Sequence, residues 1–424
     1  MRVGHDVADL GLAGAGADRI EWAGRGMPVL AEVGERFAAR RPLAGFAVAA
    51  CLHVTAETAN LLRVLRAGGA RVALAASNPL STQDDTAAAL VEHEQVAVFA
   101  RRGVDRSGYY KHLGAVLDAA LAGPGECFVL DDGCDLVTTL HTERPADLTR
   151  IRAGIEDTTT GVLRLREMSR AGWLRVPMVA VNDTGARRMF DNRYGTGQSC
   201  LDAIVRATGV LVAGSTFVVA GFGPCGHGIA DRARGLGARV LVTEVDPARA
   251  LEAVMEGFAV VPMSVAAAVG DVFVTATGSR DVLRAEHYAV MRDGAVLANA
   301  GHFDVELDLA GLSAAALTRR QVRGQVEELR LAGDRCVLLL AQGRVVNLAA
   351  AEGHPAAVMD MTCAGTALTL AWLAANPAPP PGVHEVPPEI DTELAALKLA
   401  ALGVDLDVAS PAQVAYRNSW AHGS

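Results

Sequence analysis

The chain has 424 residues, of which 51% are hydrophobic and 21% charged, and its 39 Lys and Arg against 48 Asp and Glu give a net charge of -9. This length is enough for two or three domains with their own cores, and the acidic balance offers no basic face for nucleic acid. The seven cysteines are scattered and lack metal-type spacing, so we expect reduced thiols, no disulfide framework and no metal site.

Two uncharged stretches, residues 207–226 and 361–383, could be mistaken for membrane spans. Glycine or proline interrupts both, and neither is a uniformly apolar helix of about 20 residues. We interpret them as buried strand, core helix or linker. No apolar run follows Arg2, so no signal peptide is expected, and we predict a cytoplasmic protein that is not embedded in a membrane.

In the first half of the chain, short apolar runs alternate with helix-like segments, which is typical of a parallel sheet covered by helices. The expected strands are residues 45–51, 70–76, 96–100, 127–130 and 177–181. Polar residues follow four of these strands: His53, Thr55, Glu57, Ser77, Asn78, Ser81, Asp84, Asp131, Asp132, Asp135, Asn182 and Asp183. Because ligands bind at the carboxyl ends of such strands, a polar pocket is predicted there. For Ser81 and Asp84 a helix capping box is an equally good interpretation.

A second α/β unit follows residue 199. It has an expected strand at 216–220, the turn GFGPCG at 221–226, a helix at 229–235 and strands at 240–243, 272–275 and 295–299. The turn fits the G-x-G-x-x-G pattern of a dinucleotide site between strand and helix, although a structural turn would also fit. Glu244 lies 18 residues beyond Gly226, where an acid binds ribose hydroxyls and disfavours a 2′-phosphate, so NAD is favoured over NADP.

Other polar residues carry little information alone. His53 and His302 each follow a strand-like run, and a lone histidine there is more often packed than catalytic. Arg187 and Asp191 are four residues apart, which on a helix is an ordinary ion pair.

Eight segments together resemble the S-adenosyl-L-homocysteine hydrolases. They are CLHVTAETA (51–59), NPLSTQDD (78–85), DDGCDL (131–136), EDTTTGVLRL (156–165), FDNRYGTGQS (190–199), GFGPCGHGIADRARGLGARVLVTEVDPARALEA (221–253), NAGHFDVE (299–306) and GRVVNLAAAEGHPAAVMDM (343–361). Since the resemblance spans nearly the whole chain, we identify it as a member of this family.

The resemblance implies a homotetramer that uses tightly bound NAD to split S-adenosylhomocysteine reversibly into adenosine and homocysteine. Oxidation of the ribose 3′-OH makes the 4′ hydrogen acidic, so that a base can remove it and thiolate can leave C5′. Water then adds to the 4′,5′-enone, and reduction at C3′ restores the sugar. The implied partners are therefore S-adenosylhomocysteine, adenosine, homocysteine or a related nucleoside.

The resemblance also implies residue roles. His53 and Asp132 correspond to acid–base groups near C4′ and C5′, and Asp157, Arg187, Asp191 and His302 lie near the 3′-OH and nicotinamide. Substrate contacts are implied for Thr55, Glu57, Thr58, His354 and Met359. NAD contacts are implied for Thr158, Thr159, Thr160, Asn192, Gly221, Gly223, Gly226, Glu244 and Asn347.

Two positions depart from the family at one locus: Arg187 replaces a lysine and Asp157 replaces a glutamate. Arginine stays protonated in proteins, so Arg187 cannot be the base that the lysine is thought to be. The combined reach of the pair is roughly conserved. We therefore expect the cation–carboxylate contact to persist, with proton transfer moved to Asp191, His302 or a water.

Milder departures lie elsewhere. Pro224 and His227 replace a bulky aromatic and an arginine of many relatives and could reshape the pyrophosphate contact. The chain also lacks the Lys-x-x-x-Tyr tail of longer members, and with Thr196 it resembles the shorter bacterial and archaeal branch.

The predicted fold is two doubly wound α/β domains, one of them a Rossmann NAD-binding domain, plus a short tail. Residues 1–190, completed by 353–385, form the discontinuous substrate domain, 191–352 the NAD domain and 386–424 an oligomerisation tail. Two chain crossings predict a hinge. Besides hydrolysis, two alternatives stay open: a paralogue that applies the same enone chemistry to another 5′ substituent or nucleophile, and an inactive NAD- or adenosine-binding regulator.

Overall fold

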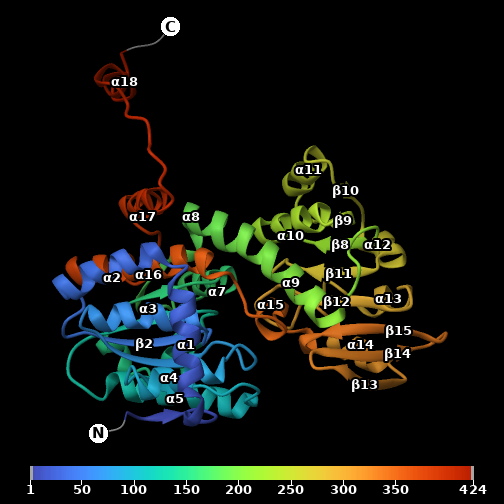
Figure 1. Cartoon of the computed structure of the whole chain (residues 1–424), viewed down its shortest axis with the longest axis horizontal. Coiled ribbons are helices and arrows are strands. Elements are labelled where there is room, and N and C mark those ends of the chain that lie inside the picture. Colours follow the sequence, from blue (N-terminus) through green and yellow to red (C-terminus); the bar gives the residue numbers. More distant parts are fainter. Residues whose placement is uncertain (1–2, 422–424) are drawn as a thin grey trace.

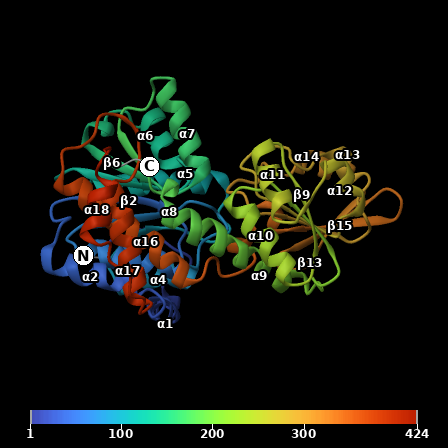
Figure 2. The same ribbon diagram turned by 90° about the horizontal axis from the view of Figure 1, so that it is seen from above.

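The computed structural model describes residues 3–421, which form two α/β domains side by side. A C-terminal arm, residues 403–421 with helix α18 (Pro411–Arg417), projects away from both domains (Figure 1). The view from above shows the same two bodies, with the C-terminal helices projected over the first of them (Figure 2). The predicted class of two α/β domains is confirmed.

The first domain is built on a parallel sheet of eight strands in the order β1-β4-β3-β2-β5-β6-β7-β16. The strands are β1 (His5–Asp6), β2 (Ala47–Leu52), β3 (Arg71–Ala76), β4 (Ala97–Phe99), β5 (Cys127–Asp131), β6 (Ile151–Glu156), β7 (Pro177–Ala180) and β16 (Gly382–His384). Because β16 pairs with β7, the C-terminal region of the chain completes this sheet.

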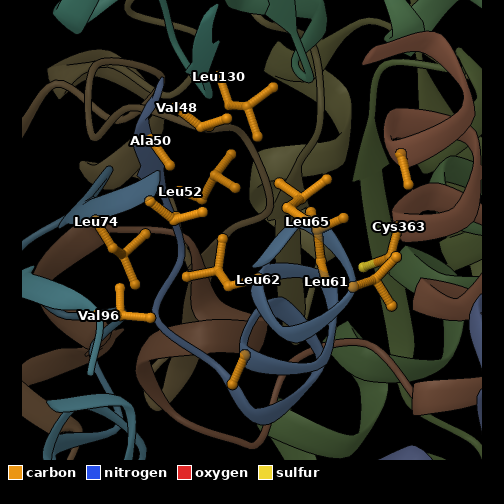
Figure 3. Packing of buried hydrophobic residues seen from close by; sticks show 14 of the residues in the cluster. Val48, Ala50, Leu52, Leu61, Leu62, Leu65, Leu74, Val96, Leu130 and Cys363 are labelled. Atoms are coloured by element: carbon orange, nitrogen blue, oxygen red, sulfur yellow. The ribbon is translucent and has the colours of Figure 1, made fainter. Parts of the chain in front are cut away.

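Helices cover both faces of that sheet. One face packs against α1 (Ala13–Gly24), α2 (Pro28–Arg40), α3 (Ala56–Ala67), α4 (Asp84–Glu92) and α16 (Ala356–Ala375). The other packs against α5 (Arg106–Leu121), α6 (Asp135–Thr142) and α7 (Thr159–Arg170). In β2, Val48, Ala50 and Leu52 point toward α3, as Figure 3 shows, while Cys51 joins the opposite core. A strand that is apolar on both sides is what a doubly covered parallel sheet requires.

The second domain has a sheet in the order β10-β9-β8-β11-β12-β15-β14-β13. Its strands are β8 (Thr216–Ala220), β9 (Arg239–Thr243), β10 (Ala259–Val260), β11 (Val272–Thr275), β12 (Ala295–Asn299), β13 (Thr318–Arg323), β14 (Val326–Leu331) and β15 (Arg335–Leu340). Its helices are α9 (Thr196–Thr208), α10 (Pro224–Gly235), α11 (Pro247–Met255), α12 (Met263–Val269), α13 (Ala285–Tyr288), α14 (Leu309–Ala315) and α15 (Val346–Ala349). The parallel part has the doubly wound order of a dinucleotide-binding fold, with β8 at the centre.

The apolar-run pattern found nine of the parallel strands but missed β6, β15 and the short strands β1, β10 and β16. The sequence of β6, IRAGIE, carries Arg152, which interrupts the apolar run. The Arg152 guanidinium leaves the sheet and donates to the carbonyls of Leu373 and Asn376. The helix expected from residue 229 begins earlier, at Pro224, because Gly223 already serves as its N-cap.

The chain crosses between the domains through η4 (Arg188–Gly195), a π-helical segment that continues into α9, and returns through α15 to α16. Among the described residues, α16 is the one helix long and apolar enough to span a membrane by length and composition. In the structure 61% of its most apolar window is buried, against α2, α3 and α17 (Pro388–Ala401). This agrees with the interpretation of residues 361–383 as core helix and linker.

A buried ion pair attaches α17 to the first domain. Lys398 Nζ lies 2.9 Å from Asp360 Oδ2, and the other oxygen of Asp360 accepts from the backbone N–H of Leu30. The Asp360 side chain is fully buried and that of Lys398 is 9% exposed. Asp360 therefore fixes the start of α2 and the position of α17 at the same time.

We expect Lys398→Met to lower the free energy of unfolding by about 3 kcal/mol, because it leaves a buried carboxylate without its counter-charge. Arg36→Met is the matched control, since Arg36 on α2 pairs with Glu393 on the same α17, but with side chains 37% and 45% exposed. That surface pair should contribute about 1 kcal/mol or less. Urea unfolding of both variants measures the difference, and equal losses would contradict a special role for the buried pair.

Candidate active site

A cavity of about 470 Å³ lies between the two domains, where the carboxyl ends of both sheets meet α16. Residues implied by the family resemblance line it from both sides: His53, Thr55, Glu57, Thr58, Asp132, Asp157, Thr158, Thr159, Thr160, Arg187, Asp191, Asn192, Gly223, His302, Asn347, His354 and Met359. Gly221, Gly226 and Glu244, for which NAD contacts were also implied, are not among the lining residues. The volume suits a small organic ligand.

His53 and Asp132 form a hydrogen-bonded pair at the ends of β2 and β5. Nε2 of His53 lies 3.0 Å from Oδ2 of Asp132, and Ser77 Oγ donates to the same oxygen at 2.9 Å. On its other side, Nδ1 of His53 lies 2.7 Å from Ser81 Oγ. Ser81 is thus a neighbour of the histidine, and the capping-box interpretation is wrong, since Gln83 is the N-cap of α4.

Burial sets the charge state of this pair. It lowers the pKa of His53 to about 4, although the charge of Asp132 acts in the opposite direction. Burial would raise the pKa of Asp132, but the positive charge that His53 and His302 can carry and the Ser77 hydrogen bond hold it below the usual value. At neutral pH the pair is therefore a neutral imidazole next to a carboxylate, which is the form that can accept a proton.

His302 reaches this pair from the other domain. Its ring centroid lies 5.9 Å from that of His53. The approach depends on Gly133, which has a φ of +116°, and whose hypothetical Cβ would lie 2.6 Å from Nε2 of His302. A side chain at position 133 would therefore collide with the opposite domain.

Arg187 is the centre of a buried ionic group at the crossing between the domains. Its Nη1 donates to Asp157 Oδ1 at 3.0 Å, and its Nη2 lies 3.5 Å from Asp191 Oδ2. Thr362 Oγ1 donates to the same Asp191 oxygen, while His354 Nδ1 lies 3.3 Å from Asp191 Oδ1. The cation–carboxylate contact expected for the substituted pair is present.

The two carboxylates of this group differ. Burial raises the pKa of Asp157 to about 6, even though Arg187 opposes the shift. For Asp191 burial also acts upward, but Arg187, His354 and the Thr362 hydrogen bond hold the pKa below its usual value. Burial lowers the pKa of His354, so His354 is neutral and Asp191 ionised at neutral pH. Asp157 is the carboxylate whose titration lies nearer neutrality.

The substrate-side residues lie on α3 and the start of α16. Thr55 caps α3, and Glu57 and Thr58 lie in its first turn. Burial raises the pKa of Glu57. With Met359 these residues form one end of the cavity, opposite the second domain.

The glycine-rich turn fits a dinucleotide. Gly221 has a φ of +94°, and a Cβ on Gly226 would lie 1.8 Å from the carbonyl oxygen of Gly221, so neither position tolerates a side chain. The backbone is therefore bare where α10 begins, which is what a pyrophosphate requires. Glu244 accepts from Phe222 N at 2.7 Å at the end of β9. Asn347 lines the cavity with its Oδ1 buried and unbonded.

Pattern reasoning missed several residues that position these groups. Thr362 and Thr196 hold Asp191 and His354, and Arg249 lies over the glycine turn, where it lines the cavity. Buried Glu156 accepts from Gly133 N and Thr158 N and so joins two turns of the site. The sequence signal that could have identified Glu156 is its place as an acidic residue at the end of β6, a strand that was not predicted. His227, expected to reshape the pyrophosphate contact, does not line the cavity.

Two protein-family models match the chain. The model of the S-adenosyl-L-homocysteine hydrolase family matches residues 4–153, and the model of the NAD-binding domain of S-adenosyl-L-homocysteine hydrolase matches residues 192–353. The chain belongs to the S-adenosyl-L-homocysteine hydrolase family. Its second domain is accordingly an NAD-binding domain, and NAD is its cofactor.

Curated members of the family match over nearly their whole length. The chain is 54% identical to the adenosylhomocysteinase of Aquifex aeolicus, over 99% of both chains. It is 52% identical to that of Thermosynechococcus vestitus, over 100% of this chain and 97% of the relative. An S-inosyl-L-homocysteine hydrolase of Methanosarcina mazei is 49% identical, over 97% and 98% respectively.

We expect the imidazole of His53 to remain neutral down to about pH 4, because charging it means charging a buried ring. Asp132→Asn should lower the His53 pKa further, since the carboxylate is the neighbour that favours the charged ring. NMR titration of histidine-labelled protein measures both values. A His53 that titrates near its usual value of about 6.5 would show that the site is open to water.

Proposed function

We propose that this chain hydrolyses S-adenosylhomocysteine reversibly to adenosine and homocysteine in the cavity between its domains. The observation that carries the proposal is the opposition of His53 and Asp132, on one domain, to His302, on the other. Relatives about half identical over the whole chain bear the name of this activity, so the two alternative functions are not favoured.

Bound NAD supplies reversible oxidation of the ribose 3′-OH, which makes the C4′ hydrogen acidic. The chain must then hold the sugar and exclude water. We assign these tasks to the buried lining from both domains, with Asn347 and the bare glycine turn on the NAD side. A closed cavity is needed because an enone that met bulk water would react without control.

We assign proton removal at C4′ and proton transfer at C5′ to His53 and Asp132. The carboxylate keeps the ring oriented through the 3.0 Å contact, and the neutral imidazole can accept a proton. In the second half of the reaction the same pair can orient the water that adds to C5′. His302 faces them as a second polar group at the reacting end of the sugar.

At the 3′-OH we assign Arg187 a positioning role and Asp157 the role of proton acceptor. Arg187 is fixed in its charged form. Both oxygens of Asp191 already have polar partners, whereas Asp157 has Arg187 on one oxygen and a pKa of about 6. This replaces the expectation of Asp191, His302 or a water, and it makes proton acceptance weaken as pH falls through about 6.

Glu57 supports adenine as the base. A carboxylate accepts a hydrogen bond from the exocyclic amino group of adenine, whereas hypoxanthine presents an oxygen there that would repel it. The inosyl-specific name of one relative makes this comparison worth measuring on the chain itself.

We also propose a cytoplasmic homotetramer in which the first domain binds the nucleoside and the second binds NAD. The domain boundaries are those predicted from the sequence. Apolar side chains of the arm support assembly, with Leu406, Val408, Tyr416 and Trp420 exposed by 65%, 85%, 62% and 98%. Sedimentation of the full-length chain measures the assembly.

The purified protein is expected to convert S-adenosylhomocysteine to adenosine and homocysteine, and to run the reverse reaction from those products. Mass spectrometry follows the products, and absorbance of the bound cofactor follows the redox step. If Glu57 selects for adenine, the kcat/KM for S-inosylhomocysteine should be lower than that for S-adenosylhomocysteine by roughly tenfold or more. Cofactor reduction without hydrolysis would favour the paralogue that uses another 5′ substituent or nucleophile. Absence of cofactor reduction with every substrate would favour the inactive regulator.

Arg187→Lys and Asp157→Glu should each reduce the rate of 3′ oxidation, because each single change alters the reach across the 3.0 Å contact. The double variant should recover activity by about tenfold over the worse single one. Activity of the double variant no higher than that of the worse single would show that the two positions are not coupled.

Asp157→Asn tests the acceptor role within the same series. It should remove the oxidation step and its dependence on pH near 6, while adenosine binding measured by calorimetry persists. Thr366→Val, which removes the hydroxyl that lowers the pKa of Asp157, should instead keep the oxidation step and move its pH dependence to higher pH.

A further inference from the structure

A second group of potential metal ligands lies in the NAD domain, outside the cavity. It consists of His227 on α10 and of Glu252 and Glu256 at the end of α11. One ligand atom from each residue lies within 4.8 Å of the others. None of the three residues lines the cavity described above.

His227 is buried, with 6% of its surface exposed, and its ring is held in place by Phe222. The two rings are stacked with centroids 4.8 Å apart. Nε2 lies only 2.7 Å from Oε2 of Glu256, yet this buried nitrogen has no hydrogen-bond partner. The carboxylate oxygen therefore lies off the direction in which the ring nitrogen would donate. A cation bound to both atoms would lie between them, away from their connecting line.

The carboxylates are in an unfavourable arrangement without a cation. Glu252 and Glu256 are four residues apart, so their charges repel across one helical turn. Among residues 3–421, no ion pair or hydrogen bond engages the Glu252 carboxylate. Oδ2 of Asp231 lies 3.9 Å from Nε2 of His227, but Asp231 forms ion pairs with Arg193 and Arg234. We therefore do not count Asp231 as a metal ligand.

We infer that His227, Glu252 and Glu256 bind a divalent zinc ion that links α10 to α11. One imidazole nitrogen, two carboxylates and a water form a ligand set suited to Zn²⁺, whereas Mg²⁺ prefers oxygen ligands alone. The two carboxylates balance the charge of the ion. Tetrahedral ligands at about 2.1 Å lie about 3.4 Å apart. Oε2 of Glu256 would therefore move back from its 2.7 Å contact with Nε2, and the exposed Glu252 side chain would close on the ion.

The position of the site indicates its effect. α10 begins at the glycine turn, and α11 follows the loop that carries Glu244. A zinc bridge between them stabilises the two helices behind the NAD site without contacting the cavity.

The test uses the full-length, NAD-loaded protein after removal of metal with a chelator. Zn²⁺ is titrated by calorimetry, and Co²⁺ is titrated as a spectroscopic probe of nitrogen and oxygen ligation. The variants are His227→Gln and Glu252→Gln. The matched controls are His287→Gln, a buried histidine of the same domain, and Glu286→Gln, a surface glutamate with 60% of its side chain exposed. His302→Gln reports on the other group that could hold a metal, His53, Asp132 and His302.

We expect one Zn²⁺ per chain and a higher unfolding temperature with metal. Both cluster variants should weaken binding by roughly tenfold or more, and the controls should not. Unchanged affinity in His227→Gln, loss confined to His302→Gln, or no binding by the unaltered protein would each overturn the inference. In the last case His227 and Glu256 form an ordinary ion pair.

Discussion

The site depends on the ion pairs that the buried guanidinium of Arg187 makes with two carboxylates. Arg187 lies directly before the crossing between the domains and holds Asp157, which follows β6, and Asp191, from the π-helical crossing itself. Without the guanidinium between them, two carboxylates at this buried site would repel each other. Because arginine keeps its charge, the group persists through any proton transfer that takes place around it.

This ionic group also explains why the cavity needs both domains. Asp191 is held by Thr362 and His354, which enter as the chain returns into the first domain. The two crossings thus meet at one carboxylate. A relative movement of the domains that opened the cavity would change the surroundings of Asp191, and it would thereby couple access to the site to its electrostatics.

Local patterns predicted much of this architecture. The apolar runs of the parallel strands, the polar residues at their ends and the glycine turn each obey short-range rules. Where a charged side chain interrupts an apolar run, the prediction failed: Arg152 concealed β6, although its guanidinium leaves the sheet to bind carbonyls beyond it. The family resemblance supplied the residue roles that spacing could not.

The sequence by itself determined the two α/β domains and the dinucleotide turn, because each depends on residues close together in the chain. It also showed arginine at 187 and aspartate at 157, where the family that it resembles has lysine and glutamate. Only the tertiary structure decided that Arg187 bridges two carboxylates and that His302 reaches His53 past Gly133. These contacts join segments far apart in the chain. Their distances follow from how two domains pack, and no local periodicity records that packing.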